Sequence, residues 1–232
     1  MGRRLPAAVA AVAFPPQCVL CARPLPNLAA VCPTCAASLP VLHGPRCIRC
    51  GDRLQDETAD LCLRCGTSRG FVDRIVSLGP YEGGWGELAR LLKFEREIGV
   101  GRWLAGRMAD LVRREGLLPS IDAVTYVPMM RHDRRQRGFN QAEILARGIA
   151  QKLRLPLVHS IRKVRFTPPQ SRSSGKDRRE NLRDAFQALP CTYDHVLLVD
   201  DICTTGATVE ECARTLKRGG AHFVVAATVA RA

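Results

Sequence analysis

The chain has 232 residues, of which 46% are hydrophobic and 25% charged, and its formal net charge at pH 7 is +13. This composition is typical of a folded globular protein with one or two domains and argues against a disordered chain. No apolar run approaches the ~20 residues of a membrane span, so we expect no spanning segment.

Residues 1–14 place two arginines before an apolar run, which loosely resembles a secretion signal. Pro6 interrupts that run and Pro15 follows it directly. We therefore expect a short helix that packs on the body of the protein, and a cytoplasmic location.

Eight of the eleven cysteines form four CxxC pairs, separated by gaps of ten, eleven and eleven residues. One CxxC turn presents two thiolates along an edge of a tetrahedron, and a second turn completes a closed zinc site. Disulfides are rare in cytosolic proteins, so we predict two structural zinc ions. Sequential pairing of the CxxC turns is preferred, and interleaved pairing stays open. The predicted ligands are Cys18, Cys21, Cys32, Cys35, Cys47, Cys50, Cys62 and Cys65.

The CxxC pairs predict a small N-terminal domain over residues 15–67, a linker over 66–70 and a larger domain over 71–232. The small domain has few large apolar residues, so the metals should supply much of its folding free energy. Three cysteines lack ligand spacing. We expect Cys212 in a helix core, and only Cys203 is a candidate for an exposed functional thiol.

In the larger domain, apolar patterns predict strands over 75–78, 123–127, 195–199 and 223–229. They predict helices over 85–97, 102–115, 140–154 and 208–218, and a long loop over 165–183. Strands that alternate with helices indicate an α/β fold with a doubly wound, mostly parallel sheet. Ligands of such sheets bind beyond the carboxyl ends of the strands.

Positive charge is concentrated in residues 131–183, which hold 15 Lys/Arg against 4 Asp/Glu. So one-sided a block indicates contact with phosphorylated small molecules or nucleic acid. This basic block begins in a turn after the strand at 123–127, where guanidinium groups could bind phosphate oxygens. The alternative interpretation of the turn is a solvated loop that adds only solubility. The arginines of this turn are Arg131, Arg134, Arg135 and Arg137.

Residues 196–208 comprise four apolar residues, two acids and a Thr/Gly turn that opens a helix. The strand delivers Asp200 and Asp201 to its exit, and the amides of the turn form an anion cradle. The pattern resembles the phosphoribosyl-pyrophosphate (PRPP) signature of type I phosphoribosyltransferases. That resemblance implies that both acids bind the ribose hydroxyls. The 5′-phosphate would be held by Thr204, Thr205, Gly206, Ala207 and Thr208.

Position 204 bears on the acceptor. In relatives of this fold that salvage 6-oxopurines, the corresponding residue is an aspartate that handles a proton on the base. Because Thr204 offers no general base, the sequence disfavours oxopurine salvage.

Motifs outside the basic turn and residues 196–208 extend the resemblance. They include 91–94 (LLKF), 137–141 (RGFNQ) and 179–186 (RENLRDAF), preceded by the four CxxC pairs. Over residues 15–232 the chain resembles the ComF/GntX family of amidophosphoribosyltransferase-like proteins. This implies a type I phosphoribosyltransferase fold with an N-terminal zinc-ribbon domain, an association with natural competence, and a mobile hood near the active site. The hood contacts implied here are Gln170, Arg172, Lys176 and Arg179, with Asn181 and Arg183.

The resemblance implies an enzyme that binds PRPP with Mg²⁺ and transfers the phosphoribosyl group to an unidentified nitrogen acceptor. Asp200, Asp201 and Arg137 would be catalytic, and Arg131 and Arg135 would bind the pyrophosphate. The alternatives are a catalytically silent protein that binds single-stranded nucleic acid and a regulator that senses PRPP. The expected partners are PRPP and single-stranded DNA or competence proteins, although the basic block offers only two aromatic residues for base stacking.

Overall fold

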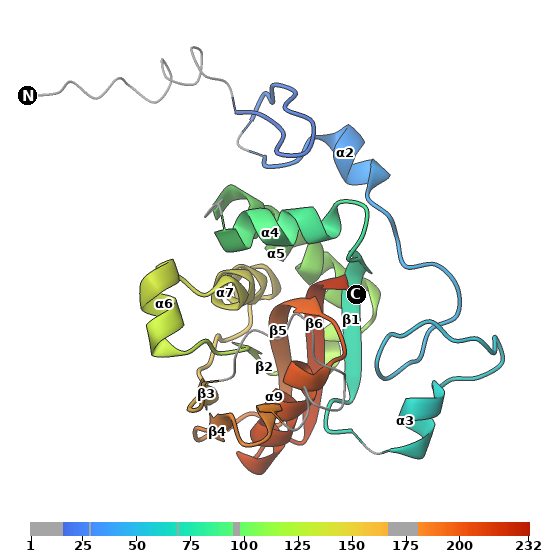
Figure 1. Cartoon of the computed structure of the whole chain (residues 1–232), viewed down its shortest axis with the longest axis vertical. Coiled ribbons are helices and arrows are strands. Elements are labelled where there is room, and N and C mark those ends of the chain that lie inside the picture. Colours follow the sequence, from blue (N-terminus) through green and yellow to red (C-terminus); the bar gives the residue numbers. More distant parts are fainter. Residues whose placement is uncertain (1–15, 28, 69, 95–97, 167–180) are drawn as a thin grey trace, which may run out of the picture.

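The computed structural model describes residues 16–27, 29–68, 70–94, 98–166 and 181–232. The segment predicted as a short N-terminal helix lies outside this range. The body is a four-stranded parallel sheet in the order β1-β6-β5-β2 (Figure 1). The strands are β1 (Arg74–Pro80), β2 (Ala123–Tyr126), β5 (His195–Cys203) and β6 (Phe223–Arg231).

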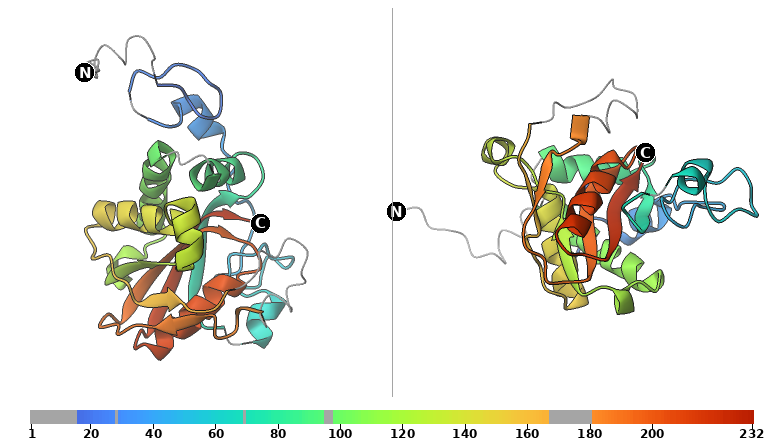
Figure 2. Two further views of the ribbon diagram at one scale, coloured as in Figure 1. Left: turned by 60° about the vertical axis from the view of Figure 1, so that its left-hand side comes forward. Right: turned by 90° about the horizontal axis from the view of Figure 1, so that it is seen from below.

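Helices cover both faces of this sheet (Figure 2). One face packs against α4 (Trp85–Phe94), α5 (Ile98–Arg114) and α7 (Gln141–Leu153). The other face packs against α9 (Ala207–Arg218) and an antiparallel hairpin of β3 (Ile161–Lys163) and β4 (Phe186–Ala188). The central strands are buried on both sides, which is why β5 and β6 read as continuous apolar runs rather than alternating ones. The predicted doubly wound parallel fold is confirmed.

Several elements differ from the sequence-based expectations. Strand β5 continues through both acids to Cys203 because β6 extends to Arg231 and supplies partners, with Asp200 opposite Thr228. The basic turn contains a helix, α6 (Arg131–Arg137), which ends at Gly138 in a left-handed conformation with φ 87°. Helix α5 begins at Ile98, earlier than expected, and the β3–β4 hairpin was not predicted. A short 3-10 helix, η1 (Leu118–Ser120), precedes β2.

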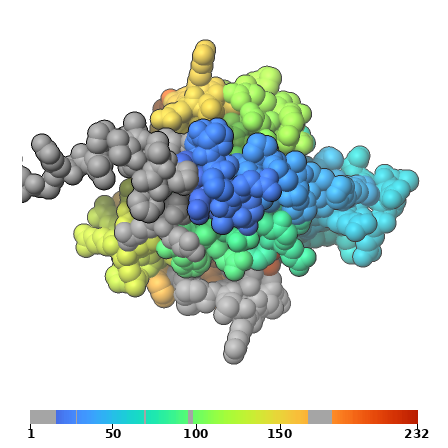
Figure 3. Space-filling model, turned by 90° about the horizontal axis from the view of Figure 1, so that it is seen from above, coloured from blue at the N-terminus to red at the C-terminus, as the bar shows by residue number. Residues whose placement is uncertain are grey.

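The N-terminal cysteines form two modules that pack with different parts of the core. The first lies beyond α4 and the second beside the edge strand β1 (Figure 1), and both lie at the surface of the molecule (Figure 3). The first zinc module, residues 16–39, contains α2 (Pro33–Ser38) and packs with α4 and α5. The second zinc module, residues 45–67, contains α3 (Leu63–Thr67) and packs with the core under α9.

The chain between the modules approaches β1 closely. The indole nitrogen of Trp85 donates to the Pro40 carbonyl at 2.8 Å, directly beside Gly79. A Cβ at position 79 would lie 2.0 Å from the Trp85 ring nitrogen and 2.6 Å from the Pro40 oxygen. Only glycine fits there, so this contact is built into the sequence of β1.

Helix α7 begins at Asn140, which is 5% exposed. Its Oδ1 accepts from the Ala142 amide and its Nδ2 donates to the Val127 carbonyl, both at 3.0 Å. We expect Asn140→Ala to lower the free energy of unfolding by about 1–2 kcal/mol, because it removes the helix cap and leaves the Val127 carbonyl without that donor.

Urea denaturation measures this loss, and Asn27→Ala is the matched control. Asn27 makes the same local contact, with its Oδ1 3.0 Å from the Ala29 amide, but on an exposed turn without a helix. We expect a change below about 0.5 kcal/mol there. Equal losses in the two variants would contradict a capping role for Asn140.

Candidate functional site

Two buried acids lie near the carboxyl end of β5, and Asp200 and Asp201 are 9% and 7% exposed. The Asp200 Oδ1 accepts from the Asp201 amide at 2.9 Å, and the Asp201 Oδ1 accepts from the Ile202 amide at 3.0 Å. Burial raises the pKa of Asp200 well above its usual value, and the neighbouring Asp201 raises it further. The strand thus holds a carboxyl group that is costly to ionise.

This raised pKa predicts that Asp200→Asn stabilises the fold near neutral pH. The pKa of Asp200 is higher in the folded protein than its unfolded value of 3.8. The contribution of Asp200 to the free energy of unfolding is therefore fully present below pH 3.8, and it is lost as the pH rises toward the folded pKa. Asparagine keeps the acceptor for the Asp201 amide without the charge. We expect the melting temperature near pH 7 to rise by about 2–4 °C for each kcal/mol relieved.

Thermal melts of both proteins between about pH 4 and pH 8 test this, and the gain should shrink toward the acidic end. Asp110→Asn is the control, because that carboxylate is 57% exposed and pairs with Arg113 on the helix surface. A gain that does not depend on pH would contradict the electrostatic explanation.

The phosphate loop, residues 200–208, comprises the end of β5, the connection to α9 and the start of α9. Gly206 has φ 77°, a left-handed conformation that turns the chain into the helix. The Thr205 Oγ1 accepts from the Ala207 amide at 3.4 Å, and the Gly206 carbonyl accepts from the Glu210 amide at 2.9 Å. The amides in the first turn of a helix lack intrahelical acceptors, so those of α9 that follow Ala207 could donate to an anion.

The arginines of α6 divide into different environments. Arg137 donates to the Gln141 Oε1 at 3.2 Å, and the Gln141 Nε2 donates to the Asp201 Oδ2 at 3.2 Å. This relay connects the basic helix to the acids. Arg134 instead pairs with Glu143 at 3.1 Å. Arg131 and Arg135 are exposed on α6, and in the described part of the chain neither contacts the acids.

The eight CxxC cysteines gather into two groups, Cys18–Cys21–Cys32–Cys35 and Cys47–Cys50–Cys62–Cys65, each with its sulfur atoms within 4.8 Å of one another. This is the sequential pairing that the spacing favoured. Amides of Cys32 and Cys35 donate to the sulfur atoms of Cys18 and Cys32 at 3.3 Å. Burial raises the pKa of Cys18, but amide hydrogen bonds outweigh it and lower the pKa to about 6. Four converging sulfur ligands with amide donors fit a structural zinc ion at each site.

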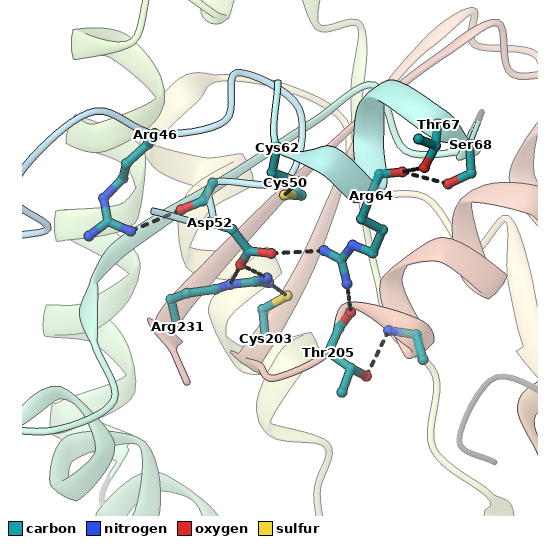
Figure 4. A network of polar contacts seen from close by, with 12 residues as sticks. Arg46, Cys50, Asp52, Cys62, Arg64, Thr67, Ser68, Cys203, Thr205 and Arg231 are labelled. Carbon is teal, nitrogen blue, oxygen red and sulfur yellow. Dashed lines mark hydrogen bonds and ion pairs between the residues drawn. The ribbon is translucent and has the colours of Figure 1, made fainter. Parts of the chain in front are cut away.

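One cysteine expectation was wrong. Cys203 is 1% exposed, and its sulfur accepts from the Arg231 Nη1 at 2.6 Å (Figure 4). It is buried because β5 continues past the acids and pairs Cys203 with Arg231 of β6. The hood residues Gln170, Arg172, Lys176 and Arg179 lie outside the described residues.

Several residues that line this region carried no assigned role in the sequence. Gln141 had a signal, since it ends the RGFNQ motif. Asp52 and Arg64 each follow a cysteine ligand by two positions, yet they contact Arg231 and Thr205 (Figure 4). Those partners are 179 and 141 residues distant in the chain, so no local sequence pattern could predict these contacts.

Comparison with known proteins supports both parts of the molecule. Residues 9–66 match the Double zinc ribbon domain family, and residues 140–232 match the Phosphoribosyl transferase domain family. Competence protein F of Haemophilus influenzae is 32% identical over 196 residues, which are 81% of this chain and 85% of that protein. DNA utilization protein YhgH of Salmonella typhi is 32% identical over 212 residues, 89% of this chain and 86% of that protein.

Solved structures of low similarity were also found. The glutamine PRPP amidotransferase from B. subtilis has 21% identity and a TM-score of 0.39, and covers 56% of this chain and 27% of its own. An adenine phosphoribosyltransferase has 18% identity and a TM-score of 0.38, over 61% of this chain and 75% of its own. Among the described residues, every helix is too short or too polar to traverse a lipid bilayer.

Proposed function

We propose that the chain binds PRPP with Mg²⁺ and transfers the phosphoribosyl group to a nitrogen acceptor. The proposal starts from the family to which the chain belongs, that of Competence protein F and DNA utilization protein YhgH. The observation that carries the proposal is that Asp200 and Asp201 are buried near the carboxyl end of β5, in the segment that leads into the first turn of α9. Carboxylates suit ribose hydroxyls and helix amides suit a phosphate, and a phosphoribosyl group presents both.

Each part of PRPP then has its own contact. The 5′-phosphate takes the amides of residues 204–208, and the ribose hydroxyls donate to the two acids. The pyrophosphate lies toward α6, where Arg137 is held by Gln141 and where Arg131 and Arg135 are exposed. Mg²⁺, carried with PRPP, would neutralise part of the pyrophosphate charge.

In the transfer, the bond between C1′ and the pyrophosphate oxygen breaks, and pyrophosphate leaves with the electron pair. The lone pair of the acceptor nitrogen forms the new bond to C1′, and the nitrogen releases a proton to solvent. The protein contributes by positioning and by placing cations opposite the leaving group. Since Thr204 supplies no base, the acceptor is a nitrogen that needs no proton removed beforehand.

Isothermal titration of the full, zinc-loaded chain with PRPP and Mg²⁺ tests the binding step, with ribose 5-phosphate as the weaker control ligand. A pyrophosphate-release assay over nucleobases and amines then identifies the acceptor. Absence of PRPP binding would remove the proposal, while binding without any release would favour the PRPP-sensing alternative. The two four-cysteine clusters need reduced thiols, which supports a cytoplasmic setting.

A second candidate function is the binding of single-stranded nucleic acid, which one surface feature favours. A cavity of about 370 Å³ beside α6 and α7 is lined by Arg102, Arg134, Arg147 and Phe139, and by Glu143, which pairs with both Arg134 and Arg147. An adjoining hollow shares Arg102 and adds Trp103 and Lys152. Cations with aromatic rings are the side chains that track a single strand.

Fluorescence anisotropy with a labelled oligonucleotide tests this function. We expect the logarithm of the binding constant to fall linearly with the logarithm of the salt concentration. The double variant Arg102→Ala with Arg147→Ala should make that slope shallower by the equivalent of about one to two phosphate contacts. Salt-independent binding, or none, would remove the candidate.

A further inference from the structure

The phosphate loop is clasped from outside by the second zinc module (Figure 4). The Arg64 Nη1 donates to the Thr205 carbonyl at 3.0 Å, and its Nη2 donates to the Asp52 Oδ2 at 3.0 Å. The other oxygen of Asp52 accepts from the Arg231 Nε at 3.0 Å. A continuous chain of charge-assisted hydrogen bonds therefore links the module, the loop and the end of β6.

Both module residues in this chain are placed by the metal ligands. Arg64 lies between Cys62 and Cys65, and Asp52 follows Cys50 by two positions. The sulfur atoms of Cys50 and Cys62 are 3.6 Å apart, so one cluster fixes the spacing of both segments. Helix α3 has five residues and is too short to persist without that support.

The contact at Thr205 has a defined geometric consequence. In a trans peptide the carbonyl and the following amide point in opposite directions, and the described chain contains no cis bond. A Thr205 carbonyl held outward by Arg64 therefore turns the Gly206 amide to the opposite side. If that peptide flipped, the carbonyl oxygen would replace an amide donor and repel a phosphate.

We infer that Arg64 is a positioning residue for PRPP, through which the second zinc module holds the Thr205–Gly206 peptide in its anion-binding orientation; this rests on the proposed function. The first zinc module lies elsewhere, because it packs with the part of the core that contains α4 and α5. The two zinc sites therefore differ in role: the second sets ligand affinity, and the first only supports the fold.

Titration calorimetry with PRPP and Mg²⁺ on full-length variants tests the inference. We expect Arg64→Ala to weaken binding by about 10-fold while it keeps two zinc ions per chain, because it loses one charge-assisted hydrogen bond to the loop. Arg64→Lys keeps a charged donor and should recover part of that loss. Arg53→Ala, an exposed arginine of the same module, is the matched control and should bind like the parent.

A second pair of variants separates positioning from folding. Cys62→Ser with Cys65→Ser should weaken PRPP binding at least as much as Arg64→Ala, and adding Arg64→Ala to it should change nothing further. Cys18→Ser with Cys21→Ser should leave PRPP affinity unchanged. Parent-like affinity in both Arg64 variants, or an equal loss in the first-module variant, would overturn the inference. Failure of the parent itself to bind PRPP would instead overturn the proposed function.

Discussion

Asp201→Asn is expected to weaken the binding of PRPP with Mg²⁺ by about 10–100-fold, since hydrogen bonds to charged groups contribute about 1.5–3 kcal/mol. Asp201 connects the phosphate loop to the arginines of α6: it lies on β5 and accepts a hydrogen bond from Gln141, which in turn accepts one from Arg137. An asparagine loses the charge that attracts the ribose hydroxyl. It also weakens the connection to Arg137, on the pyrophosphate side of the site.

Titration calorimetry at fixed Mg²⁺ measures the affinity, and a melting curve of the same sample shows that the variant is folded. Asp194→Asn is the control, because Asp194 is an exposed acid directly before the first residue of β5. If Asp201→Asn bound PRPP as tightly as the parent, Asp201 would not be a ribose ligand, and the cavity beside α6 and α7 would become the better candidate site.

Features set by short-range spacing were predictable from the sequence. Sequential zinc pairing follows from gaps of ten and eleven residues, which let neighbouring CxxC turns close on one metal. The alternation of strands and helices gave the parallel sheet for a similar reason, since each βα unit is local. Asn140 and Arg154, expected as the limits of one helix, cap α7 at its two ends.

Features that depend on a distant partner were not predictable. Strand β5 runs past the acids because β6 offers pairing up to Arg231, and the same pairing buries Cys203. The four arginines after β2 were read as one converging group, yet Glu143 draws Arg134 aside while Gln141 holds Arg137. Which partner each arginine meets depends on how α6 lies relative to α7, which no periodicity encodes.

Removal of zinc is expected to unfold the second zinc module while the sheet remains folded. Apparent binding free energies of structural zinc are about 10–16 kcal/mol at neutral pH, more than a module of this size can obtain from burial. We expect the core of the sheet to stay folded without the metals, because Leu197, Leu198 and Val225 are fully buried.

Hydrogen exchange before and after treatment with a strong chelator measures this. After chelation the amides of α3 should lose protection and those of β5 should keep it. Added zinc should restore the protection of α3. The amides of residues 203–208 are the informative ones, because Arg64 attaches that loop to the metal-dependent segment. If they lose protection together with α3, the loop and the module open as one unit. If α3 kept its protection without metal, the four sulfur ligands would not be what folds the module.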